Sequence, residues 1–372
     1  MTDFAVAIEV LRWSIGPLLL CRFPRLPAGT SVGYEVDSDV VVVVPARNEG
    51  DNIADAVASI TMQRPHPTEI VVVDDNSDDA TAERAAAHGA RVVDAGPVPD
   101  GWLGKPHAAA TGVAASKAGT VVFLDADVRL TAPDVIARLA AVVPAHDDGH
   151  GRGLVTVQPS HVIARPYEAL NAFFVLVSLM GTNAFTVLGR HARTIGAFGP
   201  CLATTRDAYA GVGGHAAPEV RGSIVDDVAL AARYRADGRP VVAFAGGDDV
   251  TYRMYPGGLR QLIDGWTKNI AAGATATRPL VLLLVVAWLS GCITAAFGVI
   301  ARPSLIAALT YAAYAAAVAV LLRRCGRFPR LAAALYAIPL AVFLLVFVRA
   351  IALRALGRPV AWKARAVGGR AK

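Results

Sequence analysis

The C-terminal part of the chain constrains the fold most, because it combines long apolar stretches with a complete lack of acidic residues. Residues 271–372 contain thirteen Lys or Arg and no Asp or Glu. Three stretches without charge lie within them, at residues 279–300, 303–322 and 331–348. A helix needs about 20 apolar residues to cross a bilayer. The sequence therefore predicts membrane segments over residues 279–353, followed by a basic cytoplasmic tail at 354–372.

The distribution of charge bears on partners and topology. The formal net charge of +6 hides a split, because those thirteen basic residues leave residues 1–270 at −7. This split argues against a nucleic-acid partner. Basic clusters lie before and after residues 331–348, and positive charge favours the cytoplasmic face. Three full crossings would put the two clusters on opposite faces of the membrane. We therefore expect one segment, 331–348, which Pro339 would break, to be re-entrant or interfacial.

The N-terminal segment is also apolar, although Glu9 and Arg12 interrupt it. We expect residues 1–25 to form a transmembrane or interfacial helix. A cleaved signal peptide is not expected, because the segment lacks a basic start and a clean cleavage site. The four cysteines are far apart, which suggests neither disulfides nor a zinc site.

Between these segments, residues 38–270 alternate apolar strands with helices. Val40–Val44 and Glu69–Val73 are apolar runs, and a polar loop and a helical pattern follow each of them. Such alternation predicts an α/β domain with a mostly parallel sheet, flanking helices and right-handed crossovers. Ligands of such sheets bind at the carboxyl ends of the strands. We expect this domain to be cytoplasmic.

Asp125 and Asp127 follow the apolar run Val121–Leu124, where a buried strand should end. At i and i+2 on a strand they would project the same way. Two hard oxygen ligands without a nearby Cys or His favour Mg²⁺ or Mn²⁺, shared with substrate phosphates. The alternative is a solvated turn.

Other polar groups suggest how a nucleotide would bind. The chain has neither the GxGxxG nor the GxxxxGK[ST] pattern, which disfavours dinucleotide and P-loop sites. Asp74 and Asp75 could accept hydrogen bonds from a base and a ribose. Lys105 precedes a helix expected to begin at Pro106, where a phosphate could bind, although a solvated lysine is the alternative. The set indicates a nucleotide-diphosphate donor.

Further along, residues 167–189 are apolar and could be either core or an interfacial helix. Gly213-Gly-His215 is a pattern of small residues typical of close approach between backbone and ligand. Asp226 and Asp227 begin a helix, where acidic residues usually act as caps. Beside a metal and a diphosphate, however, Asp227 would be placed to take a proton from an acceptor hydroxyl. An acceptor carboxylate is already ionised and would need no base.

The order of these motifs resembles the family-2 glycosyltransferases of the GT-A fold. The motifs are Val-Val-Pro45-Ala-Arg-Asn-Glu49, Val-Val-Val-Asp74-Asp75, Gly-Trp102-Leu-Gly-Lys105, Leu-Asp125-Ala-Asp127 and Val-Asp226-Asp227. The Gly-Trp-x-Gly-Lys and Gly-Gly-His elements are similar to the carotenoid (diaponeurosporenoate-type) branch. Asp226 stands where the family often has Glu.

The resemblance implies roles for particular residues. Asp227 would be the catalytic base, and Asp125 and Asp127 would serve the divalent cation. The expected donor-binding residues are Pro45, Ala46, Arg47, Glu49, Asp74, Asp75, Lys105, Asp125 and Asp226. The expected acceptor-side residues are Trp102, Cys201, His215, Trp266 and Lys268. A Gln-x-x-Arg-Trp element of related processive enzymes is out of register here, which favours transfer of a single sugar.

The resemblance further implies an inverting transfer from a nucleotide-diphosphate sugar, with UDP-glucose expected, to a lipophilic acceptor such as a carotenoid or other terpenoid. The enzyme would be a multi-pass protein of the cell (inner) membrane. Two alternatives stay open: a polyprenyl-phosphate glycosyltransferase using UDP-glucose or GDP-mannose, and a sugar nucleotidyltransferase.

Overall fold

The computed structural model describes residues 3–28, 39–145, 153–188, 196–356, 358, 360–362 and 365–367. They divide into two compact units, which are described separately. Unit 1 comprises residues 1–23, 161–195 and 253–372, and unit 2 comprises residues 24–160 and 196–252. The basic tail expected at 354–372 lies largely outside the described residues.

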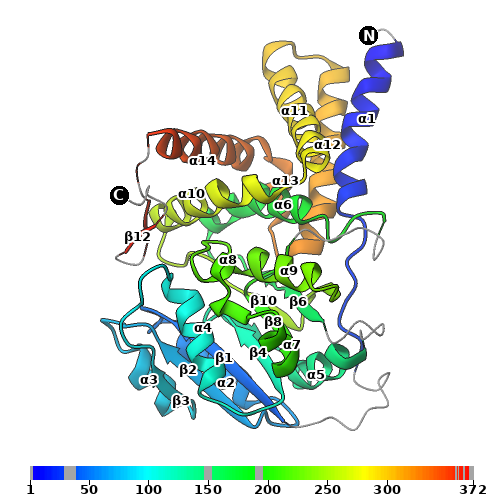
Figure 1. The fold of residues 1–372 in the computed structure, drawn as a ribbon. Coiled ribbons are helices and arrows are strands. Elements are labelled where there is room, and N and C mark those ends of the chain that lie inside the picture. Colours follow the sequence, from blue (N-terminus) through cyan, green and yellow to red (C-terminus); the bar gives the residue numbers. More distant parts are fainter. Residues whose placement is uncertain are drawn as a thin grey trace. The chain divides into compact units, whose positions relative to one another are not determined.

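Unit 2 is the α/β domain (Figure 1). Its main-sheet strands are β1 (Val40–Ala46), β2 (Glu69–Asp74), β3 (Arg91–Asp94), β4 (Thr120–Leu124), β6 (Leu154–Gln158), β8 (Cys201–Thr205) and β9 (Val241–Ala245). Its helices are α2 (Ile53–Thr61), α3 (Thr81–Ala87), α4 (Gly104–Ala114), α5 (Val135–Ala145), α7 (Arg206–Gly211), α8 (Pro218–Arg221) and α9 (Asp226–Ala236), with the 3₁₀ turn η4 (Gly214–Ala216). Two short strands, β5 (Val128–Leu130) and β10 (Val250–Tyr252), pair antiparallel outside this sheet.

The strand order confirms the expected fold class. Within the described residues the main sheet has seven strands in the order β3-β2-β1-β4-β8-β6-β9. Strands β1, β2, β3 and β4 are parallel, as are β6 and β9. Strand β8 runs antiparallel to both of its neighbours, β4 and β6, so the sheet is mixed although mostly parallel. The carboxyl ends of β1, β2 and β4 therefore lie along one edge.

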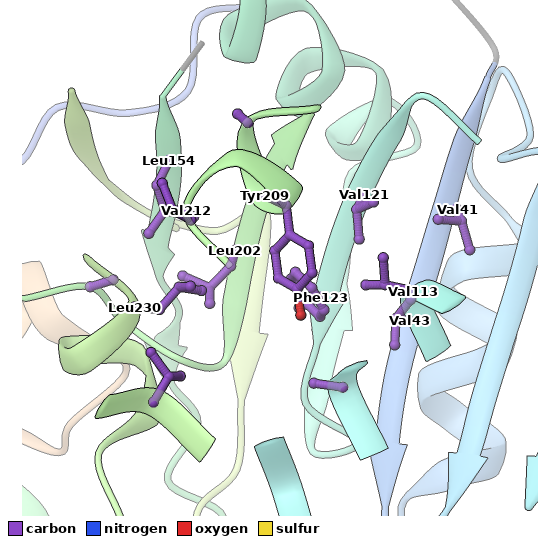
Figure 2. Packing of buried hydrophobic residues seen from close by; sticks show 14 of the residues in the cluster. Val41, Val43, Val113, Val121, Phe123, Leu154, Leu202, Tyr209, Val212 and Leu230 are labelled. Atoms are coloured by element: carbon purple, nitrogen blue, oxygen red, sulfur yellow. The ribbon is translucent and has the colours of Figure 1, made fainter. Parts of the chain in front are cut away.

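The core of unit 2 follows from its β-branched strands. All five valines of β1 are buried, because a central parallel strand has both faces covered. On one face, Val43 and Val121 pack in a cluster with Phe123, Leu202 and other buried residues (Figure 2). The apolar strands are thus rigid supports for the loops at their carboxyl ends.

Unit 1 collects the apolar helices from both ends of the chain. Its elements are α1 (Asp3–Leu19), η2 (Pro166–Asn171), α6 (Ala172–Thr182), α10 (Leu259–Ala276), α11 (Pro279–Ala301), α12 (Leu305–Cys325), α13 (Arg330–Ala334), α14 (Ala337–Ala355), β11 (Val360–Trp362) and β12 (Arg365–Val367). Strand β7 (Ser160–His161) lies where the chain passes from one unit to the other. Within the described residues, three helices (α11, α12 and α14) are long and apolar enough to cross a membrane.

Helices α1, α11 and α12 lie side by side (Figure 1). Arg12 donates to Ser290 Oγ of α11 at 2.8 Å, and Trp13 Nε1 donates to the carbonyl of Ala313 in α12 at 3.0 Å. Arg324 donates to the carbonyl of Leu20 at 2.9 Å, so the C-terminal ends of α1 and α12 lie at the same level.

The stretch at 331–348 differs from the sequence-based expectation. It is not broken at Pro339, because the interruption lies between α13 and α14, and Pro339 occupies the first turn of α14. Proline is tolerated there, since the N–H groups of a first helical turn have no partner within the helix. In Figure 1, α14 lies across the direction of α11 and α12 and beside α10.

Within the stretch expected at 167–189, η2 is followed by α6, which ends at Thr182, and residues 183–188 lie in neither helix. Most side chains of α6, including Phe173 and Phe174, are buried within unit 1. The sequence left open whether this stretch is part of a core or an interfacial helix, and the burial of α6 within unit 1 favours the core.

Candidate active site

The ends of β1 and β2 are joined by hydrogen bonds at the edge of the sheet. The backbone N–H of Asp75 donates to the carbonyl of Ala46 at 2.8 Å. Arg47 extends across the gap, and its Nη1 donates to the carbonyls of Asp75 at 2.5 Å and Asn76 at 3.0 Å. The Asp75 side chain is buried. Three expected donor-binding residues therefore form one rigid corner.

The loops beside this corner are held by their own polar groups. Asp74 accepts a hydrogen bond from Ser77. The backbone N–H of Glu49 donates to Thr81 Oγ1 at 2.9 Å, and its carboxylate accepts from Asn52 at 3.0 Å. Pro45, in register with a β2 residue, lies within β1. The structure thus places residues expected to bind the nucleotide at the ends of β1 and β2.

Lys105 pairs with the carboxylate at the end of β4. Its Nζ lies 2.7 Å from Asp125 Oδ1 and 3.0 Å from Oδ2. Helix α4 begins at Gly104 and not at Pro106 as expected, which places Lys105 in the first turn. Burial alone would lower the pKa of Lys105, but the charges of Asp125, Asp226 and Asp227 raise it. The raised pKa keeps the ammonium charged beside the carboxyl groups of Asp125, Asp226 and Asp227.

The Asp125-Ala126-Asp127 segment is a turn, not the end of a strand. Strand β4 ends at Leu124, and the N–H of Val128 donates to the carbonyl of Asp125 at 3.0 Å. The same-face argument from strand geometry therefore does not apply. Burial lowers the pKa of Arg129, while charges including that of Asp127 oppose the shift.

The donor set fits a hydrated divalent cation. Among the described residues there is no group of three or more His, Cys, Asp or Glu that could hold a metal. The two carboxylates Asp125 and Asp127 are hard ligands of the kind that Mg²⁺ and Mn²⁺ accept, and these cations usually keep waters and bind substrate phosphates. The residues present therefore fit a cation completed by a diphosphate.

Asp226 and Asp227 have different surroundings although they are neighbours in sequence. Asp227 Oδ2 accepts from the N–H of Gly199 at 2.8 Å, and its Oδ1 accepts from the N–H of Val228 at 2.9 Å. Asp226 is buried, with His215 Nε2 at 3.6 Å from its Oδ2. A Cβ on Gly199 would lie 3.1 Å from Asp227 Oδ2, so glycine permits this close approach.

The two carboxyl groups consequently differ in pKa. Burial opposes ionisation of Asp226, but the charge of Lys105 and the nearby His215 ring outweigh it and lower its pKa. Burial, together with the charge of Asp226, raises the pKa of Asp227 to about 6. Carboxyl groups whose pKa values are pushed apart in this way are typical of acid–base sites.

The expected acceptor-side residues fall in several places. Trp102 packs edge-on against His107. Cys201 is buried at the start of β8, where burial raises the pKa of its thiol to about 12. Trp266 and Lys268 belong to α10 in unit 1, where Trp266 is buried and donates to Asn171 Oδ1 at 2.5 Å. That contact gives Trp266 a packing role within unit 1.

His215 is buried at 2% exposure, so it does not form part of an accessible surface. Its Nδ1 lies 2.9 Å from the hydroxyl of Tyr209, a residue that the sequence analysis did not single out. The glycine pair before His215 was the available signal, but only the folded chain brings Tyr209 next to it.

Comparisons with known proteins agree with this architecture. The family model described as glycosyl transferase family 2 matches residues 41–151. The chain is 34% identical over 266 residues to the 4,4′-diaponeurosporenoate glycosyltransferase of Staphylococcus haemolyticus (strain JCSC1435), covering 71% of this chain and 69% of that protein. It is 32% identical over 299 residues to that of Staphylococcus aureus (strain USA300), covering 80% and 78%.

A solved structure shares the fold. The mannosyltransferase PcManGT from Pyrobaculum calidifontis, in complex with GDP-Man and Mn²⁺, has a TM-score of 0.52 and 20% identity, covering 93% of this chain and 96% of that one. The fold is therefore that of the GT-A nucleotide-sugar transferases, with apolar C-terminal helices. The chain belongs to glycosyltransferase family 2 and is homologous to the 4,4′-diaponeurosporenoate glycosyltransferases.

Proposed function

We propose that this enzyme transfers one sugar from a nucleotide-diphosphate sugar, UDP-glucose in the first instance, to the carboxyl group of a carotenoid-like acid dissolved in the membrane. The observation that carries the proposal is the homology to enzymes named for diaponeurosporenoate, whose name denotes a carboxylate. The apolar helices of unit 1 support an acceptor that is itself dissolved in lipid. Membership in a glycosyltransferase family sets aside the nucleotidyltransferase alternative.

The donor would bind along the edge formed by β1, β2 and β4. Arg47 and Asp75, joined at the corner between β1 and β2, would lie against the nucleoside. Lys105 would balance the charge of the diphosphate as it leaves. A divalent cation at Asp125 and Asp127 would supply further neutralisation of the leaving group when it is bound.

Transfer would be a single displacement with inversion. An acceptor oxygen forms a bond to the anomeric carbon while the bond from that carbon to the diphosphate oxygen breaks. Asp227 is proposed to accept the proton of an acceptor that arrives protonated. Its pKa, raised to about 6 by burial and by Asp226, suits that role near neutral pH.

A carboxylic acceptor fits this pKa. A carboxyl group in water ionises near pH 4, but removal from water disfavours the charged form and raises its pKa. An acid entering from the bilayer therefore keeps its proton to a higher pH than it would in water. Asp227 would remove that proton at the site, where the ionised acceptor is the better nucleophile.

We further propose that α1, α11 and α12 cross the membrane and that α14 lies in its cytoplasmic interface. The bond from Arg324 to Leu20 keeps the basic cluster that follows α12 level with the end of α1, from which the chain enters the α/β domain. An in-plane α14 would leave the C-terminal basic residues on that same side. This arrangement satisfies the positive-inside tendency for both clusters.

Membranes containing the enzyme test the proposed donor and acceptor. Labelled nucleotide sugars would be supplied one at a time, with Mg²⁺ or Mn²⁺, and label would be followed into extractable lipid. Transfer from UDP-glucose to added 4,4′-diaponeurosporenoate is expected. No transfer to this acid from any common nucleotide sugar would reject the proposal.

A further inference from the structure

A buried chain of polar groups connects Tyr209, His215 and Asp226 inside unit 2. The backbone N–H of His215 donates to Tyr209 Oη at 2.9 Å, and the same Oη lies 2.9 Å from His215 Nδ1. On the other side of the ring, Nε2 lies 3.6 Å from Asp226 Oδ2. All three side chains are buried.

The first two contacts indicate which nitrogen of the His215 ring carries a proton in the proposed arrangement. Tyr209 Oη accepts the backbone N–H, and its own hydroxyl hydrogen can be donated to His215 Nδ1. In that arrangement Nδ1 is unprotonated and the ring proton is on Nε2. That proton is directed at the Asp226 carboxylate.

Packing prevents the ring from turning away. The His215 ring meets the Phe123 ring edge-on at 5.0 Å, and Tyr209 lies beside Phe123 in the core (Figure 2). Gly214, with φ +53°, allows the backbone to lie close to the Tyr209 ring, because a Cβ at this position would be 2.3 Å from carbons of that ring. The Gly-Gly-His pattern is thus explained by contact with Tyr209.

We propose that Tyr209 and His215 are positioning residues that hold Asp226 as a fixed carboxylate and thereby make Asp227 the reacting member of the pair. This inference rests on the proposed function of Asp227. The charge of Lys105 acts on both carboxyl groups. Asp226 also has the His215 ring beside it, whereas Asp227 accepts backbone N–H groups from Gly199 and Val228.

Substitutions that keep or remove the donor to Asp226 test the proposal. His215→Leu removes it, whereas His215→Gln keeps an N–H donor and an oxygen acceptor. The contact of His215 Nε2 with the Asp226 carboxylate, at 3.6 Å, is longer than an ordinary hydrogen bond, so His215→Leu is expected to lower kcat by about 10-fold. The KM for the donor sugar should change little, and His215→Gln should recover most of kcat. Rates of His215→Leu within twofold of the parent enzyme would overturn the proposal.

A matched pair of tyrosines separates positioning from simple packing. Tyr234 is also buried in the same core, and its hydroxyl lies 2.7 Å from Thr204 Oγ1. Tyr209→Phe and Tyr234→Phe each remove one buried hydroxyl. Both should lower the melting temperature, but only Tyr209→Phe should lower kcat and shift the pH dependence of the rate. Equal kcat values for the two variants would contradict the positioning role.

The tautomer of His215 gives a readout that needs no acceptor. In ¹⁵N spectra of the full chain in detergent, the His215 signals are those that disappear in His215→Gln. The proposal requires the proton on Nε2, and a ring protonated on Nδ1 alone would overturn it. If the parent enzyme transfers no sugar to a carotenoid acid, the proposed function is wrong. The tautomer of His215 would still show whether Tyr209, His215 and Asp226 are connected as proposed.

Discussion

Asp227→Asn should stabilise the protein at neutral pH while damaging its function. The folded protein holds the Asp227 carboxyl with a pKa of about 6, compared with an ordinary value of 3.8, because of burial and the neighbouring Asp226. The folded state therefore binds this proton more tightly than the unfolded chain does. The contribution of this carboxyl group to stability is greatest below about pH 4 and is lost as the pH rises through about 6. Asparagine does not ionise, so the variant does not lose this stability as the pH rises.

The size of the effect follows from the shift in pKa. A rise from 3.8 to about 6 corresponds to about 3 kcal/mol against the ionised folded state, at about 1.4 kcal/mol per unit. Asparagine keeps only one acceptor oxygen, so one of the bonds from Gly199 and Val228 is lost, at about 1 kcal/mol. The net gain expected above about pH 7 is about 2 kcal/mol, and it should disappear or reverse below about pH 4.

Melting temperatures of detergent-solubilised enzyme across this pH range provide the assay. Asp79→Asn is the control of opposite sign, because hydrogen bonds from Thr81 and the N–H of Gly50 outweigh burial and lower the pKa of Asp79. That variant should be less stable than the parent enzyme at neutral pH, and the difference should shrink in acid. An Asp227→Asn variant that melts below the parent enzyme at every pH would refute the reasoning.

Two further predictions concern the cation and the membrane. Asp127→Asn should weaken binding of a nucleotide sugar about 10- to 100-fold when Mn²⁺ is present and hardly at all when it is absent. Calorimetry measures both affinities. Equal losses in the two conditions would argue against a cation at this turn. A fluorescent protein fused after Lys372 should fold and fluoresce, because the C-terminus is expected in the cytoplasm. Alkaline phosphatase inserted at residues 302–304 should be active, because the loop between α11 and α12 is expected on the opposite side of the membrane. If alkaline phosphatase fused after Lys372 were active, α14 would have to cross the membrane.

The sequence predicts the strands that carry the site, because valine-rich runs leave little choice of conformation. Val40–Val44 and Glu69–Val73 are observed as β1 and β2, with Arg47 and Asp75 at their ends. The antiparallel strand β8 could not be derived, since its pairing with β4 depends on contacts between residues far apart in the chain. Local sequence patterns predict individual strands and helices, whereas the order of strands in the sheet depends on contacts across the whole fold.

The same limit applies to the candidate site. Lys105 and Asp125 were both expected to serve a diphosphate, but their ion pair depends on how α4 packs against the end of β4. His215 was expected on the acceptor side, and the structure places it between Tyr209 and Asp226. The spacing of Tyr209, His215 and Asp226 in the sequence does not indicate this contact, because the three residues lie on α7, η4 and α9.

The central claim, transfer to a carboxyl group, is tested most directly by comparing 4,4′-diaponeurosporenoate with its methyl ester as acceptors for labelled UDP-glucose. The account predicts an alkali-labile glucosyl ester from the acid and no product from the methyl ester. It also predicts that Asp227→Asn is most impaired in acid and approaches the parent rate above about pH 8, where the acceptor ionises unaided. Label in a hydroxylated lipid but none in the acid, with a loss of about 100-fold or more for Asp227→Asn at every pH, would contradict it.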